Sequence, residues 1–147
     1  ELLLPPERLE TFMAQARACC AEWRADIDKI EVRRTLDESD TVLCWARREY
    51  AAVSLGLSTP PTLGGAVRST QLRRQLIDAA ISHDGSFAIH GTPEATREQA
   101  LACYPGLRTL LAEKRRIDPG ERLCNPWYRH HRTLLEHRAC EVRWNRE

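Results

Sequence analysis

Long apolar runs and a strong net charge are both missing from this 147-residue sequence. No stretch approaches the roughly 18 consecutive apolar residues that a membrane-crossing helix requires, so we expect no transmembrane segment. Lysine and arginine number 22 against 21 aspartates and glutamates, which gives a formal net charge of +1 at pH 7. A charge this close to zero argues against a dedicated nucleic-acid surface. With 42% hydrophobic and 29% charged residues, the composition predicts a soluble globular protein.

The sequence also lacks the short motifs that mark several kinds of site. It contains six cysteines but no Cys-x-x-Cys pair, and because zinc sites need close-spaced ligand pairs we expect no metal site. We expect free thiols in a reducing compartment, with the cytoplasm as the location. No Gly-x-Ser-x-Gly elbow is present. The pair Gly64-Gly65 lies in a linker, without the preceding strand and glycine spacing of a phosphate-binding loop.

The hydrophobic spacing predicts helices that alternate with short strands. Apolar residues recur at three- and four-residue steps from Leu9 to Trp23, and the pattern changes to period two between Lys29 and Leu36. The connections do not fit a doubly wound sheet, so we predict an α+β fold with helices packed on one face of a small antiparallel sheet. We also expect strands over Tyr50–Leu57 and Ser86–His90 and a helix over Ala66–Ile81. A further helix should begin at a capping box at Thr96, and the helix after it should end at about Ile117. The last expected helix begins at Pro126.

Glu31 and Arg33 are the first candidate site residues. Two positions apart on a predicted strand, they project from one face, opposite Ile30 and Val32, which we expect to face the core. A carboxylate beside a guanidinium can hydrogen-bond a polyhydroxylated substrate, and the arginine supplies positive charge near a developing oxyanion. The same spacing also fits an ordinary ion pair on an exposed strand.

Several stretches, taken in order, carry a resemblance to a known family. They are the strand and acidic turn IEVRRTLDESD, the strand and capped helix SFAIHGTPEATREQ, and the closing run KRRIDPGERLCNPWY. Their order resembles the C-terminal, substrate-cap end of the FAD-linked oxidases of sugars, alditols and aldonolactones, which are vanillyl-alcohol-oxidase-like flavoproteins. The resemblance runs from the first residues to about Leu135. It implies an enzyme in which a hydride leaves a sugar carbon for the flavin.

The resemblance gives roles to four residues. Glu31 and Arg33 would face the flavin and position the substrate hydroxyls, and with His90 they are the catalytic candidates. His90 follows a predicted strand where relatives carry Lys or His near the flavin pyrimidine ring, so it would stabilise the reduced flavin. His90 and Asn125 are the candidates for contact with the cofactor. By the residues alone, His90 can equally be a structural side chain, and Asn125 part of a simple helix stop and return strand.

The flavin-binding domain of this family lies N-terminal to the cap, and its pyrophosphate-binding glycines do not occur in this sequence. The chain begins with Glu1 rather than Met, so we expect that its natural start lies further upstream. We expect residues 1–135 to be a cap domain that is inactive without a flavin-binding domain in cis or in trans, and residues 136–147 to be a basic tail. Because most of the cofactor's binding energy needs a preformed cleft, the chain alone should bind FAD weakly or not at all. The alternative is a small cofactor-free α+β module that binds a protein partner.

Overall fold

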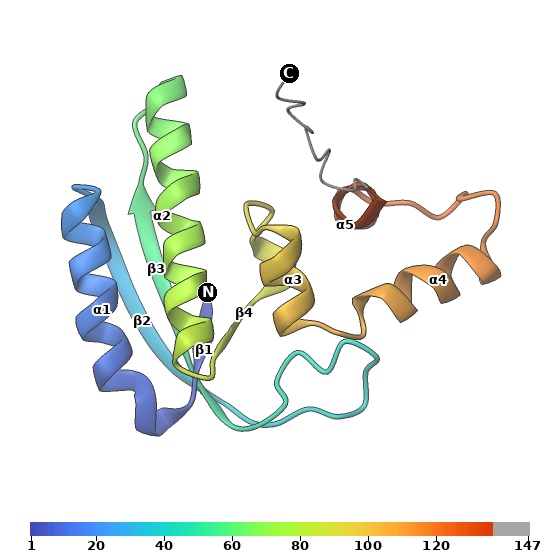
Figure 1. Cartoon of the computed structure of the whole chain (residues 1–147), viewed down its shortest axis with the longest axis horizontal. Coiled ribbons are helices and arrows are strands. Elements are labelled where there is room, and N and C mark those ends of the chain that lie inside the picture. Colours follow the sequence, from blue (N-terminus) through green and yellow to red (C-terminus); the bar gives the residue numbers. More distant parts are fainter. Residues whose placement is uncertain (137–147) are drawn as a thin grey trace, which may run out of the picture.

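Four strands form one sheet in the computed structural model, which describes residues 1–136 (Figure 1). Every neighbouring pair in the sheet is antiparallel, so the predicted α+β fold is confirmed. The first strand of the chain lies inside the sheet, and β2 and β4 form its edges, because the strand order is β2-β3-β1-β4. The strands are β1 (Leu2–Leu4), β2 (Asp26–Thr35), β3 (Tyr50–Ser58) and β4 (Ser86–Phe87).

Two long helices, α1 (Leu9–Glu22) and α2 (Leu63–Ser82), pack against each other on one side of the sheet (Figure 1). Within residues 1–136, no helix combines the length and the apolar character needed to cross a membrane. The predicted tail lies outside the described residues from position 137 onward. The remaining elements are the short 3-10 helices η1 (Pro6–Arg8) and η2 (Ile89–Gly91), and the helices α3 (Arg97–Cys103), α4 (Leu107–Ile117) and α5 (Pro126–Glu136).

Strand β1 is apolar at every position because both of its faces are covered. Leu2 and Leu4 join the main core under α1 and α2, where Val53 of β3 also lies. Leu3 points to the other side of the sheet and joins a smaller cluster with Tyr50. A strand that is buried on both faces reads as a continuous apolar run rather than as an alternation, so the period-two pattern did not reveal it.

The predicted capping box at the start of α3 is confirmed. Thr96 Oγ1 accepts a hydrogen bond from the Gln99 backbone N–H at 3.2 Å, and Gln99 Oε1 accepts one from the Thr96 N–H at 2.9 Å. The amide nitrogen of Gln99 also donates to the Arg74 carbonyl and to Asp78 Oδ1, at 2.9 Å and 2.7 Å. Gln99, in the first turn of α3, therefore also fastens this helix to α2.

Two expectations about local environment were wrong. Ile30 and Val32 pair with β3 residues on the helix-covered side, yet their exposed fractions are 52% and 50%. The reason is that β2 is an edge strand, while α2 lies against β1 and β4. The strand predicted to reach His90 also ends early, at Phe87, because its partner β1 is only three residues long. His90 lies in η2 instead.

Candidate functional site

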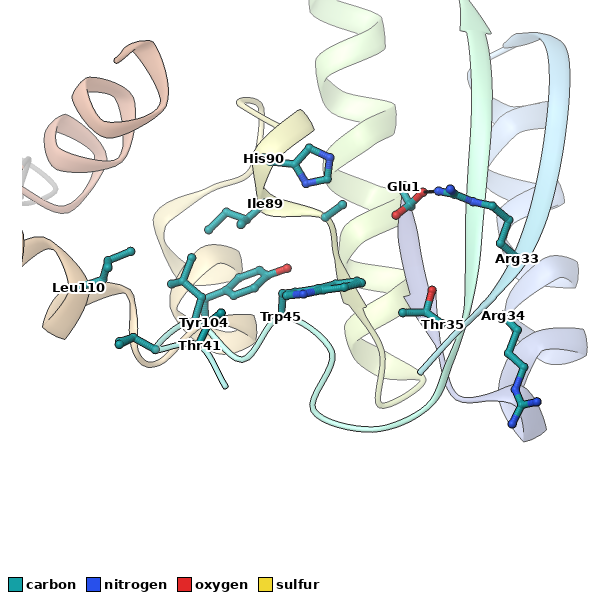
Figure 2. A pocket seen from close by; sticks show the side chains of 13 residues that line it. Glu1, Arg33, Arg34, Thr35, Thr41, Trp45, Ile89, His90, Tyr104 and Leu110 are labelled. Carbon is teal, nitrogen blue, oxygen red and sulfur yellow. Dashed lines mark hydrogen bonds and ion pairs between the residues drawn. The ribbon is translucent and has the colours of Figure 1, made fainter. Parts of the chain in front are cut away.

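A pocket of about 720 Å³ lies on the side of the sheet opposite α1 and α2 (Figure 2). Five parts of the chain meet around it: Glu1, the end of β2, the loop between β2 and β3, the segment around η2, and the segment from the end of α3 into α4. Two of the predicted site residues, Arg33 and His90, line it together. Residues from opposite edges of the sheet are therefore brought to one cavity.

Arg33 reaches this pocket because it pairs with Ala52 of β3, whose side chain lies on the face opposite α1 and α2. Its guanidinium Nη2 donates to the carboxylate of Glu1, which also accepts from Ser54 Oγ at 3.0 Å. More than half of the Arg33 side chain, 57%, stays exposed. Glu1 therefore orients the guanidinium and leaves donors of the same group free for a ligand.

Glu31 shares the face of Arg33, as the alternation along the strand predicts. Its carboxylate Oε1 lies 3.6 Å from Arg33 Nε, and its Oε2 lies 2.8 Å from Lys29 Nζ. The hydrogen bond from Lys29 is the main cause that lowers the Glu31 pKa below its ordinary value. Glu31 is not among the residues that line the pocket. The structure thus brings Glu31 to Arg33 as an ionised neighbour, and not into the cavity.

His90 carries an exposed imidazole at the pocket. In Figure 2 the ring is directed toward the Glu1–Arg33 pair. Its backbone is held in place through Ala88, two residues earlier: the Ala88 N–H donates to the Glu1 carbonyl at 3.0 Å, and the Ala88 carbonyl accepts from Thr92 Oγ1 at 3.0 Å. Ordered backbone on both sides therefore holds an exposed imidazole at the edge of the cavity.

Trp45 and Tyr104 add an aromatic lining that the sequence reasoning missed. Tyr104 is fully buried, donates its hydroxyl to the Phe87 carbonyl and packs edge-to-face on the Phe87 ring, with 5.5 Å between ring centroids. Burial raises the pKa of Tyr104 to about 12, so the hydroxyl remains a donor. The only local signal was the Tyr104-Pro105-Gly106 helix break, which marks a corner and not a pocket.

The loop between β2 and β3 forms one wall because it folds into a turn and packs on the start of α4. The Thr41 N–H donates to Glu38 Oε1 at 2.6 Å, and the Cys44 N–H donates to the Thr41 carbonyl at 3.1 Å. A Cβ atom at Gly106 would lie 2.3 Å from the Val42 carbonyl oxygen. Gly106 therefore permits a close backbone contact that no larger residue allows without movement.

Asn125 lies elsewhere, at the start of α5. Its Oδ1 accepts a hydrogen bond from the Tyr128 backbone N–H at 2.8 Å, which is the geometry of a helix N-cap. It does not line the pocket with Arg33 and His90. The structure brings together two of the four predicted site residues, places Glu31 beside one of them, and gives Asn125 a capping position.

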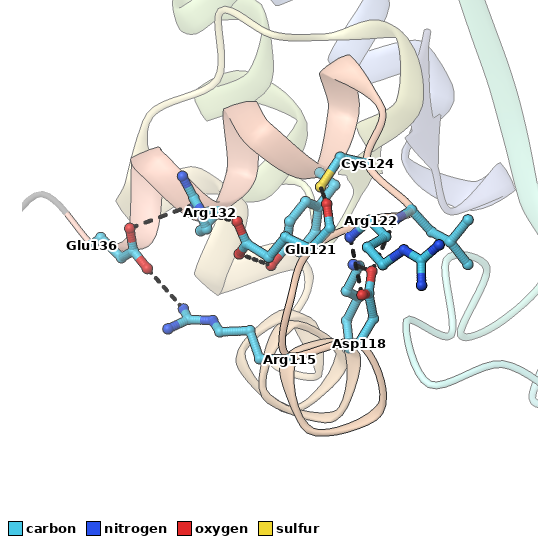
Figure 3. A network of polar contacts seen from close by, with 10 residues as sticks. Arg115, Asp118, Glu121, Arg122, Cys124, Arg132 and Glu136 are labelled. Atoms are coloured by element: carbon cyan, nitrogen blue, oxygen red, sulfur yellow. Dashed lines mark hydrogen bonds and ion pairs between the residues drawn. The ribbon is translucent and has the colours of Figure 1, made fainter.

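A polar network holds the connection between α4 and α5 (Figure 3). Glu121 accepts hydrogen bonds from the Tyr128 hydroxyl at 2.7 Å and from Arg132. Asp118 accepts from Lys114 and from two backbone N–H groups of the turn, and these bonds lower its pKa to about 2, with the Lys114 bond as the largest cause. The α4–α5 connection is thus fastened by ionised carboxylates.

Comparison with known proteins indicates no family for this chain. A scan against protein-family models, a search of curated proteins and a search of solved structures each found no match. Across residues 1–136, no group of three or more His, Cys, Asp or Glu side chains is arranged to hold a metal ion. The groups that line the pocket include the Arg33 guanidinium, the Glu1 carboxylate, the His90 imidazole and the Trp45 ring.

Proposed function

We propose that this chain is the substrate-cap part of an FAD-dependent oxidoreductase that acts on a sugar, an alditol or an aldonolactone. The supporting observation is that Arg33 and His90 line one pocket on the side of the sheet opposite α1 and α2. Its volume of about 720 Å³ is within the range of small-molecule sites. The reaction would need a flavin-binding domain, in cis or in trans, as a partner.

The residues of the pocket fit the ring of a flavin with a polar substrate beside it. Trp45, whose side chain is partly exposed, offers aromatic surface to a planar ligand, while Arg33 and His90 offer hydrogen-bond donors to its oxygens. When bound, the flavin supplies the acceptor for the hydride. No contact here replaces a pyrophosphate cleft, so we expect the chain alone to hold FAD weakly or not at all.

The candidate residues have different positions in this proposal. Arg33, oriented by Glu1, hydrogen-bonds a substrate hydroxyl and carries positive charge to the oxygen where negative charge develops. Glu31 acts as a positioning residue, since its carboxylate lies against Arg33 and not in the cavity. His90 donates from its imidazole to an oxygen of the flavin pyrimidine ring. We place Asn125 outside this group because its amide oxygen caps α5.

The proposed location is the cytoplasm. The five cysteines within residues 1–136 are free thiols, the state that a reducing compartment maintains.

Riboflavin, which has the flavin ring without the pyrophosphate, is the most direct probe of the pocket. We expect the chain to quench riboflavin fluorescence on titration, and we expect Arg33→Ala and His90→Ala to weaken this binding at least about tenfold. Arg48→Ala is the matched control, because Arg48 forms an exposed ion pair with Glu7 at 2.7 Å and does not line the pocket. Equal binding by the Arg33 and Arg48 variants, or tight binding of FAD by the chain alone, would contradict the proposal.

Co-expression with a flavin-binding domain tests the partner. The purified pair should carry a yellow cofactor and oxidise an alditol or aldonolactone, and Arg33→Ala should abolish the oxidation. A pair that retains the cofactor with no oxidation of any such substrate would leave only the second candidate, a cofactor-free interaction module. One observation favours that module: seven of the ten residues of β2 are exposed and none is buried.

A further inference from the structure

The outer edge of β2 carries an inference of its own, independent of the proposed oxidoreductase function. Strand β2 is the end of the sheet, and among residues 1–136 no other strand pairs with its outer side. An edge strand of this length presents a row of backbone N–H and C=O groups to any chain that can align with it. Natural proteins block such edges with charged side chains or bulges. The positions of the charges and of the bulge along β2 therefore decide which strand can pair with it.

The bulge divides β2 into an irregular start and a regular stretch. The register with β3 shifts between Ile27 and Lys29, and from Lys29 to Thr35 the residues pair one to one with β3. Val32 is the middle residue of this regular stretch. Glu31 and Arg33 flank it on one face of the sheet, with opposite charges.

We propose that β2 pairs antiparallel with β2 of a second copy of this chain, about a two-fold axis at Val32. In this register Glu31 of each copy lies opposite Arg33 of the other, and the two Val32 side chains meet at the axis. The four charged side chains then form a closed ring of alternating sign, since Glu31 and Arg33 are already neighbours within one chain. Opposite charges directly across two strands stabilise pairing, and like charges destabilise it.

Other two-fold registers are less favourable. An axis at Glu31 places two carboxylates together and sets Lys29 opposite Arg33, and an axis at Arg33 places two guanidinium groups together. An axis at Ile30 pairs Lys29 with Glu31 but runs into the bulge, where the regular stretch ends. Only the axis at Val32 uses the whole regular stretch and opposes unlike charges.

A two-fold axis perpendicular to the sheet keeps the same face of both copies on one side. The pockets of the two copies then open on one surface of a continuous sheet, and Arg33 remains on that surface. The dimer is isologous. It is therefore compatible with a ligand in each pocket.

Charge exchange tests the pairing. Sedimentation velocity of the full chain, over about 1 to 300 µM at low ionic strength, should show a monomer–dimer equilibrium that weakens as salt is raised. Glu31→Arg and Arg33→Glu should each weaken dimerisation at least about tenfold, because each places like charges opposite one another twice. An equimolar mixture of the two variants should form a heterodimer, since both cross-strand pairs then have opposite charges, and the double variant should dimerise with itself.

The ion pair between Glu7 and Arg48 supplies matched controls. Glu7→Arg and Arg48→Glu change the net charge by the same amounts and should dimerise like the unmodified chain. A monomer throughout the concentration series, or a dimer that Arg33→Glu leaves unchanged, would overturn the proposal. Failure of the mixture to recover the dimer would overturn it too. Recovery in the mixture also separates lost pairing from lost folding, because unfolded variants cannot restore each other.

Discussion

Replacing Tyr104 by phenylalanine removes one buried hydroxyl beside the pocket and leaves the ring in place. That hydroxyl donates to the Phe87 carbonyl at the end of β4. Without it a buried carbonyl loses a partner, which costs about 1–2 kcal/mol of the free energy of unfolding. The ring contact with Phe87 remains, so this loss should be the whole effect at neutral pH.

The pH dependence makes the prediction sharper. Burial raises the pKa of Tyr104 from 10.0 to about 12. The folded state therefore favours the neutral phenol, and this contribution is complete below pH 10 and is lost as the pH rises from 10 toward 12. Between about pH 9 and pH 11 the unmodified chain should lose about 1 kcal/mol more than Tyr104→Phe, which has no proton to release.

Urea unfolding followed by tryptophan fluorescence, at a series of pH values, measures both effects. Tyr50→Phe is the control, because Tyr50 is also buried but belongs to the smaller cluster with Leu3, whereas Phe87 and Tyr104 belong to the main core. We expect this control to change the free energy of unfolding little at neutral pH. Stability curves of the unmodified chain and of Tyr104→Phe that stay parallel from pH 9 to pH 11 would refute the reasoning.

Three further predictions concern the pocket wall and the α4–α5 connection. Asn125→Ala should lower the stability by about 1 kcal/mol through loss of the cap on the Tyr128 N–H, whereas Asn125→Ser should retain most of it in thermal denaturation. The pKa of Asp118 is lowered from 3.8 to about 2, so its ionised carboxylate contributes stability that is present above pH 3.8 and is lost as the pH falls toward 2. The free energy of unfolding of Asp118→Asn, measured from pH 5 to pH 2, should therefore fall less than that of the unmodified chain. An equal fall in both chains would contradict the prediction. Gly106→Ala should push the loop at Val42 off α4, so limited proteolysis should cut the loop faster; equal cleavage rates would show that the contact is dispensable.

Local chemistry explains which parts of the fold the sequence made predictable. The capping box at Thr96 needs only two side chains three residues apart, and the structure has both of its hydrogen bonds. The common face of Glu31 and Arg33 follows from strand alternation alone. The exposure of Ile30 does not, because it depends on where α2 lies in the final packing.

The pocket itself was beyond local reasoning. Its wall depends on contact between Val42 and Gly106, which lie far apart in the sequence and have no distinctive residue pattern. His90 was placed on a strand because its apolar neighbours suit one, but the partner strand β1 is too short to extend β4 that far. Arg33 was identified from the strand pattern, whereas its partner Glu1 and the nearby Trp45 become visible only in three dimensions.

The position of β1 has a consequence for how the chain folds. Leu2 of β1 pairs with Val53 and with Phe87, so the middle of the sheet joins residues that are widely separated along the chain. The β2–β3 ladder can form from nearby residues, but β4 has no neighbour until β1 is in place. Contacts between distant segments carry a loop-closure cost that slows folding. Completion of the sheet should therefore be a late step, at which Leu3 closes the smaller cluster with Tyr50.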